Sequence, residues 1–178
     1  MKKVILGATG SIGSSLAKKL VDSGEQVHLV GRDEASLSEL ANELNSTFTT
    51  CDVLEENFSE KIINDLKDEQ VNGLAYCVGS IDLKPLKLTK KSDFMQSFNL
   101  NLVSATEIIK SLADNLKASK GSIVLFSTVA VQQGFPNHAI VSSAKGAVEG
   151  LTLALAAEYA PNIRVNCICL LYTSPSPR

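Results

Sequence analysis

A glycine-rich turn near the start of the chain constrains the fold more than any other feature. The segment Gly7-Ala8-Thr9-Gly10-Ser11-Ile12-Gly13 follows an apolar run at 3–6 and precedes an amphipathic stretch at 12–23. A strand, a glycine turn and a helix in that order form a site for the diphosphate of a dinucleotide, bound by free amides at the positive end of the helix. The spacing is Gly-x-x-Gly-x-x-Gly, so a plain strand-to-helix turn is the alternative interpretation of this motif taken alone. We therefore expect cofactor contacts from Gly7, Thr9, Gly10, Ser11, Ile12 and Gly13.

Short apolar runs alternate with longer amphipathic segments along the whole chain. This alternation is typical of βαβ units and predicts an α/β fold with a parallel sheet. The apolar runs lie at 3–6, 26–30, 47–50, 73–78, 122–126 and 163–168, and the helical patterns lie near 12–23, 34–44, 56–68, 92–117 and 140–160.

Length and charge narrow the class of protein. The chain has 178 residues, which suits one domain, and its net charge of −2 without a basic block argues against a nucleic-acid or anionic-membrane partner. No run of 18 apolar residues is present, and the apolar run before Gly7 is too short for a secretory signal, so we expect a cytoplasmic protein. The four cysteines lack zinc spacing, so we expect buried free thiols and no metal site.

The end of the second predicted strand bears on the choice of cofactor. The segment Val30-Gly31-Arg32-Asp33 lies about twenty residues beyond the glycine turn, where the adenine ribose is expected. An arginine there favours a 2′-phosphate, so Arg32 predicts NADP(H) over NAD(H). We interpret Asp33 as the N-cap of the helix at 34–44.

These features, taken in order along the chain, resemble the short-chain dehydrogenase/reductase family from about residue 3 to 168. Beyond the glycine turn, six segments carry the resemblance: Cys51-Asp52-Val53, Tyr76-Cys77-Val78-Gly79, Phe94 to Asn101-Leu102, Gly121 to Thr128, Val141 to Ala147, and Ile163 to Ile168. The resemblance implies a doubly wound, Rossmann-like parallel sheet of strand order 3-2-1-4-5-6 between two helical layers. It also implies cofactor contacts from Asp52, Val53, Val78, Gly79 and Lys145.

The resemblance further implies the residues that carry the chemistry. The family uses a serine, a tyrosine and a lysine, assisted by an asparagine. Lys145 and Asn101 match, Thr128 stands at the serine position, and Val141 stands at the tyrosine position. Valine has no proton to give, and general acid–base help is worth about 10²–10⁴-fold in rate.

Two replacements for the missing acid are open at this point. Positions 138, 141 and 145 share one helical face, so His138 is a candidate acid; the alternative is a loop or first-turn residue, with Asn137 as the helix cap. A water-mediated relay through Thr128 or Ser142 is the second.

Two functions therefore compete. The first is an NADP(H)-dependent oxidoreductase acting on a small alcohol or carbonyl, with an altered proton donor. The second is a catalytically inactive NADP(H)-binding protein, acting as a sensor or regulator. Hydrolase and kinase functions are excluded, because neither a Gly-x-Ser-x-Gly elbow nor a phosphate loop ending in Gly-Lys-Ser/Thr occurs.

The last residues break the pattern. Family members continue past the sixth strand, whereas this sequence ends in the Ser/Pro segment 174–178. We expect a domain at 1–168, a truncated or foreign tail at 169–178 and a sheet incomplete at that edge. The resemblance also implies a homodimer or homotetramer, through the helices at 92–117 and 140–160.

Overall fold

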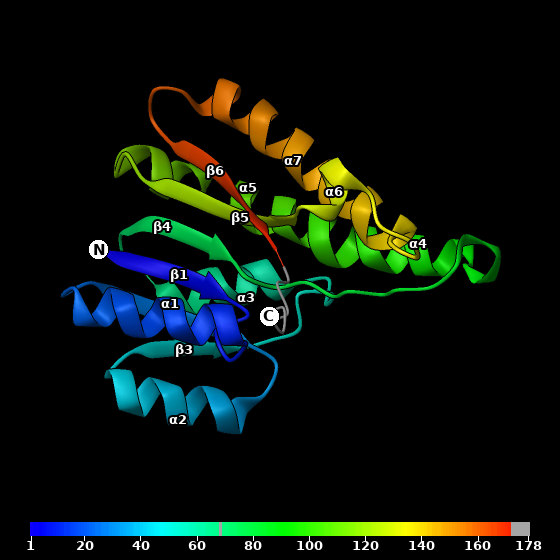
Figure 1. Ribbon diagram of the computed structural model, residues 1–178. Coiled ribbons are helices and arrows are strands. Elements are labelled where there is room, and N and C mark those ends of the chain that lie inside the picture. The colour runs from blue at the N-terminus through cyan, green and yellow to red at the C-terminus, as the bar shows by residue number, and fades with distance from the viewer. Residues whose placement is uncertain (68, 172–178) are drawn as a thin grey trace, which may run out of the picture.

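A parallel six-stranded sheet in the order β3-β2-β1-β4-β5-β6 forms the centre of the molecule (Figure 1). The structure is a computed structural model that describes residues 1–67 and 69–171. The predicted strand order is confirmed. The strands are β1 (Lys2–Leu6), β2 (Gln26–Gly31), β3 (Thr47–Thr50), β4 (Val71–Tyr76), β5 (Ser122–Thr128) and β6 (Arg164–Leu170).

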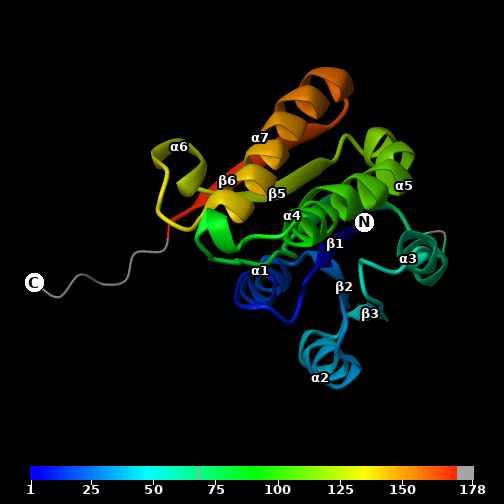
Figure 2. The same ribbon diagram turned by 90° about the vertical axis from the view of Figure 1, so that its right-hand side faces the viewer.

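Helices cover the sheet in two layers, which Figure 2 shows on opposite faces. One face packs against α1 (Ser11–Asp22) and α2 (Glu34–Leu44), around a core that includes Ile5, Leu29 and Leu37. The second core is larger and contains Leu6, Ile108 and Leu125. The helices on that face are α3 (Phe58–Leu66), α4 (Lys91–Phe98), α5 (Ser104–Ala118) and α7 (Ala139–Tyr159).

The predicted helix at 92–117 is interrupted. Its central residues form a π-helical segment, η2 (Asn99–Val103), between α4 and α5. The Ser104 hydroxyl donates to the Asn99 carbonyl at 2.9 Å across this wider turn. Two short elements escaped prediction, a 3₁₀ turn η1 (Leu86–Leu88) and α6 (Ala130–Gln133).

The last strand is longer than expected. β6 continues through Cys169 and Leu170, which pair with Ser127 and Thr128 of β5, so the strand passes the predicted boundary at 168. The remainder of the predicted tail, from 172 on, lies outside the described residues.

Helix α7 is, within the described part of the chain, the one helix long and apolar enough by composition to cross a membrane, with a mean hydropathy of 1.3. This helix packs on β5, β6 and α4, and its Thr152 is buried. Its composition is therefore that of a helix lying against a sheet.

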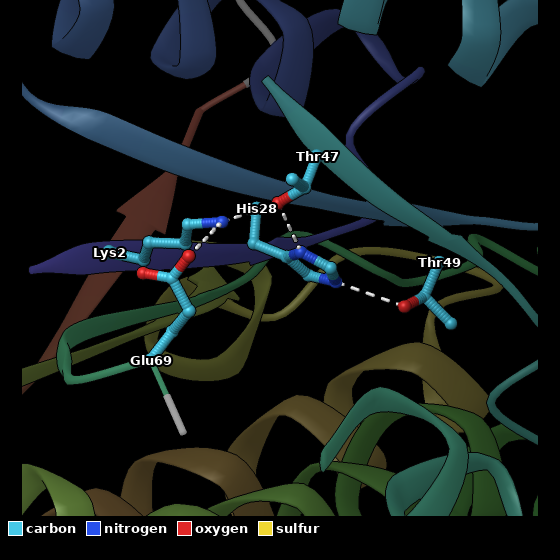
Figure 3. Close-up of polar contacts among 5 residues, drawn as sticks. All are labelled: Lys2, His28, Thr47, Thr49 and Glu69. Carbon is cyan, nitrogen blue, oxygen red and sulfur yellow. Dashed lines mark hydrogen bonds and ion pairs between the residues drawn. The ribbon is translucent and has the colours of Figure 1, made fainter. Parts of the chain in front are cut away.

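A chain of polar contacts links β1, β2, β3 and α3 around His28, which is fully buried (Figure 3). Its Nδ1 lies 2.8 Å from Thr47 Oγ1 and its Nε2 lies 2.9 Å from Thr49 Oγ1. Thr49 donates its own proton to Asp65 Oδ2 at 2.6 Å, so Nε2 carries the imidazole proton and Nδ1 accepts.

A second proton on this imidazole is disfavoured by burial and by a nearby positive charge. Thr47 Oγ1 already accepts from Lys2 Nζ at 2.8 Å, and that ammonium also pairs with Glu69 at 3.2 Å. Burial first, and then the charge of Lys2, lower the His28 pKa to about 4, against opposing effects of Asp65 and Glu69. The folded state therefore keeps His28 neutral.

We predict that the free energy of unfolding falls as pH drops from 7 to 5. Between pH 6.5 and 4 the unfolded chain binds a proton at His28 and the folded chain does not. The contribution of neutral His28 to the free energy of unfolding is therefore fully present above pH 6.5 and is lost as the pH falls below it. The expected loss from pH 7 to 5 is about 2 kcal/mol, measured by urea denaturation at each pH. His28→Gln should flatten this slope, whereas His138→Gln, at the other of the two histidines, should keep it. A wild-type slope in the His28→Gln variant would contradict the prediction.

Candidate functional site

A cavity of about 520 Å³ opens at the carboxyl ends of the strands, beside the start of α1. Parallel sheets bind ligands at this edge, and the volume suits a small molecule or part of a larger one. Its lining comes from the glycine turn, the segment after β4, the ends of β5 and β6, and the start of α7. The residues are Gly10, Ser11, Ile12, Cys77, Val78, Gly79, Ser80, Ile81, Leu83, Phe126, Ser127, Thr128, His138, Val141, Lys145 and Leu170.

The glycine turn brings the start of α1 against the end of β1. Gly7 has φ +74°, a region that favours glycine, and its N–H and that of Ala8 donate to the Val30 carbonyl of β2. A Cβ at Gly13 would overlap the Gly7 carbonyl oxygen, so the helix approaches the strand more closely than any side chain allows. Gly7 and Gly13 thus lie under the cavity and shape it, although neither lines it.

The amino end of α1 carries an uncompensated positive dipole. Gly10 is its N-cap and supplies no side-chain hydrogen bond, and the first turn holds no acidic residue. Ser11 and Ile12 face the cavity at this point, whereas Thr9 is exposed outside its lining. This end of the cavity is therefore suited to an anion.

Lys145 and Asn101 meet beside Gly79, at the end of β4. A Cβ at Gly79 would lie 3.2 Å from Lys145 Nζ and 3.0 Å from Asn101 Oδ1. The π-helical segment places Asn101, whose Nδ2 donates to Ser97 O at 2.9 Å, while its buried Oδ1 has no partner among the described residues. Burial lowers the pKa of Lys145 to about 8. An anion or hydrogen-bond acceptor that enters the cavity beside this ammonium would favour its charged form and raise the pKa again.

Thr128 ends β5 and lines the cavity. Its Oγ1 accepts from the Ala130 N–H at 3.3 Å, which leaves the hydroxyl proton free for a ligand. The neighbouring Ser127 is committed elsewhere, because it donates to Glu149 Oε1 at 2.5 Å. Ser142 donates to the Ala130 carbonyl at 3.2 Å and does not line the cavity, so the structure does not favour a relay through Ser142.

His138 and Val141 lie on the cavity wall at the start of α7. His138 is itself the N-cap of this helix, so the alternative assignment of the cap to Asn137, which has φ +67°, is wrong. His138 Nδ1 lies 2.7 Å from the Pro136 carbonyl oxygen. Val141 is buried and presents only methyl groups.

The predicted adenine end lies outside the cavity, at the ends of β2 and β3. Arg32 is an exposed side chain whose Nη1 lies 3.5 Å from Asp52 Oδ2. Asp33 caps α2 as predicted, accepting from the Ser36 N–H at 2.7 Å, and this bond lowers the pKa of its carboxyl. Val53 is buried in the core, so its backbone alone is available to a ligand.

Several lining residues were missed from the sequence. Ile81 and Leu83 follow β4 in a segment without periodicity, and Leu170 belongs to the end of β6 that was assigned to a tail. Glu149, which accepts from the lining residue Ser127, was also missed. Its position four residues after Lys145, on the same helical face, could have indicated that it lies near the site.

The described residues fit a nicotinamide dinucleotide, which the fold family implies. A Cβ at Gly7 would come within 3.0 Å of the Cys77 backbone, so glycine lets the turn pack closely against the end of β4 and leaves the start of α1 facing the cavity. At the far side, the buried Oδ1 of Asn101 has no partner among the described residues, and the partly buried ammonium of Lys145 lies close to it, so both can bind a polar group of a ligand. Within the described residues no cluster of metal-ligating side chains occurs.

Comparisons with known proteins show the family to which the chain belongs. The family model described as enoyl-(acyl carrier protein) reductase matches residues 7–175. An L-fucose dehydrogenase of Oryctolagus cuniculus is 32% identical over 93% of this chain and 60% of its own length. A tropinone reductase homolog of Arabidopsis thaliana is 34% identical, covering 98% and 71%, and an L-xylulose reductase of Bos taurus is 31% identical, covering 94% and 69%. The chain thus spans about two thirds of the length of these relatives.

Solved structures give the same result. A short-chain dehydrogenase/reductase family protein superposes with a TM-score of 0.88 at 25% identity, over 95% of this chain and 73% of that one. A short-chain type dehydrogenase/reductase from Mycobacterium ulcerans, at 22% identity, shares the fold with a TM-score of 0.87, over 94% and 66%. The chain belongs to the short-chain dehydrogenase/reductase family of oxidoreductases.

Proposed function

We propose that this chain is an NADP(H)-dependent oxidoreductase that interconverts a small carbonyl compound and its alcohol, with His138 as the proton donor. One observation carries the proposal: His138, Thr128 and Lys145 line a single cavity that also contains the start of α1. The relatives named above include dehydrogenases and reductases of small molecules, which supports the reaction class.

The hydrogen bond of His138 suits it to the role of an acid. The Pro136 carbonyl can only accept, so Nδ1 carries a proton and Nε2 remains available to a ligand. An imidazolium in this position donates from Nε2 while the carbonyl fixes the orientation of the ring.

The other residues bind and orient. A bound reduced nicotinamide would supply the hydride that such a reduction needs. Thr128 donates its free hydroxyl proton to the substrate oxygen, and His138 then delivers the proton that completes the alcohol. Lys145 and Asn101, beside Gly79, are positioned to bind a ribose hydroxyl of the cofactor.

The preference for a 2′-phosphate rests on Arg32. The Asp33 Oδ1 accepts from the Ser36 N–H as the cap of α2, so this carboxylate has a structural role in addition to any contact with a ribose. Within the described residues, the exposed guanidinium of Arg32 makes one contact, at 3.5 Å with Asp52, which leaves donors for a phosphate.

We predict that Arg32→Ala weakens NADPH binding by about tenfold or more and leaves NADH binding nearly unchanged, because charge-assisted hydrogen bonds to a phosphate are lost. Fluorescence titration with both nucleotides measures the two affinities. Arg164→Ala is the matched control. Arg164 is an exposed arginine at the start of β6, at the edge of the sheet away from the predicted cofactor site. An equal loss for NADPH and NADH would show that Arg32 does not read the phosphate.

We predict that His138→Gln lowers kcat/KM for carbonyl reduction by about 10²–10⁴-fold, the usual contribution of a general acid, while NADPH affinity stays the same. Adding Val141→Tyr to this variant should restore part of the rate, because the phenol enters the same wall of the cavity. Full activity in His138→Gln would rule out the imidazole as the donor.

A binding protein without catalysis is the second candidate, and buried Val141 is the observation that favours it. NADPH affinity in the wild type, with turnover only after Val141→Tyr, would establish this function instead.

We further propose that the chain forms a homo-oligomer. Most of the apolar helix α7 is not buried, and its Leu153 is 74% exposed. A second copy packing on this face would remove that apolar surface from water, and light scattering measures the resulting mass.

A further inference from the structure

The cavity divides into two chemically different parts. Gly10, Ser11 and Gly79, with the Lys145 ammonium, form the polar part beside the glycine turn. The remainder has a wall made mostly of hydrocarbon, and we call it the apolar wall. Its members are Ile81, Leu83, Phe126, Val141 and Leu170.

Polar groups are few beside the apolar wall. Within the described residues the cavity lining holds no aspartate, glutamate or arginine. Burial raises the pKa of the Cys77 thiol to about 12, so this side chain stays neutral. Thr128 and His138 are the groups assigned to the reacting oxygen, Ser127 is bonded to Glu149, and Ser80 is exposed at the rim.

The segment that carries Ile81 and Leu83 is fixed in place. The Lys84 N–H donates to the Asn137 carbonyl at 3.1 Å, which ties this segment to the turn before α7. Lys84 Nζ also pairs with Asp93 at 3.0 Å and with Asp82 at 3.3 Å. Ile81 and Leu83 are about half exposed, at 52% and 50%, so the wall has apolar surface left for a ligand to cover.

We infer that this site takes an uncharged, apolar ketone or aldehyde, or the matching alcohol, in preference to a polyhydroxylated or anionic substrate; the inference rests on the proposed function. Each methylene that leaves water against such a wall strengthens binding about fourfold. A substrate hydroxyl placed there finds no partner and loses its hydrogen bonds to water. A carboxylate would be desolvated against this wall, because Lys145 serves the cofactor side and His138 is assigned to the reacting oxygen.

Three ketones with the same number of non-hydrogen atoms test the inference: 2-pentanone, 1-hydroxy-2-butanone and pyruvate. With NADPH, we expect kcat/KM for 2-pentanone to exceed that for the hydroxyketone by at least about tenfold, and that for pyruvate by more. Leu83→Asn should remove most of this preference. Leu86→Asn is the control, because Leu86 is 68% exposed in η1 and does not line the cavity.

Binding separates failure of the inference from failure of the proposed catalysis. Ligand-observed NMR on the NADPH-loaded chain measures affinity for 2-octanone, 2-pentanone and the two polar ketones without turnover. Binding of the alkanones that rises with chain length and weakens in Leu83→Asn supports the inference even in an inactive protein. The inference would be overturned if the hydroxyketone or pyruvate were bound or turned over as well as 2-pentanone, or better. It would also be overturned if no ketone bound.

Discussion

The close contact between Gly13 and the Gly7 carbonyl is the constraint on which the rest of the site depends. No other residue type fits at Gly13, and the positive φ of Gly7 turns the chain at the end of β1 so that α1 begins there. Because β1 lies in the middle of the sheet, this one contact sets α1 beside the ends of both β2 and β4. The positive end of α1 and the Lys145 ammonium then face the same cavity from different sides.

Much of the fold followed from local patterns. Apolar strands separated by amphipathic helices predicted the parallel sheet, and the family resemblance supplied the strand order that the structure confirms. The π-helical turn at Asn99–Val103 could not be predicted, because it interrupts an otherwise continuous helix where that helix contacts α7, and it leaves no local signature. The pairing of His28 with Thr47, Thr49 and Asp65 depends likewise on strands meeting side by side.

The candidate site was predictable where a motif has a fixed spacing and unpredictable where loops meet it. The glycine turn, Thr128 and Lys145 were found by register, and all contribute to or shape one cavity. His138 was found by helical periodicity, although its role as the cap of α7 depends on the turn before it. Ile81 and Leu83 lie in irregular chain, where only the three-dimensional contacts of Lys84 bring them to the cavity.

The central claim is that the amides at the start of α1 bind the diphosphate of a nicotinamide dinucleotide. Calorimetric titration of NADPH into the wild type and into Ser11→Asp tests it most directly. An added carboxylate in the first turn is favourable to the helix itself but repels an anion at that point. The account predicts saturable one-to-one binding to the wild type and its loss in a stably folded Ser11→Asp variant. Undetectable binding to the wild type, or undiminished binding to the variant, would contradict it.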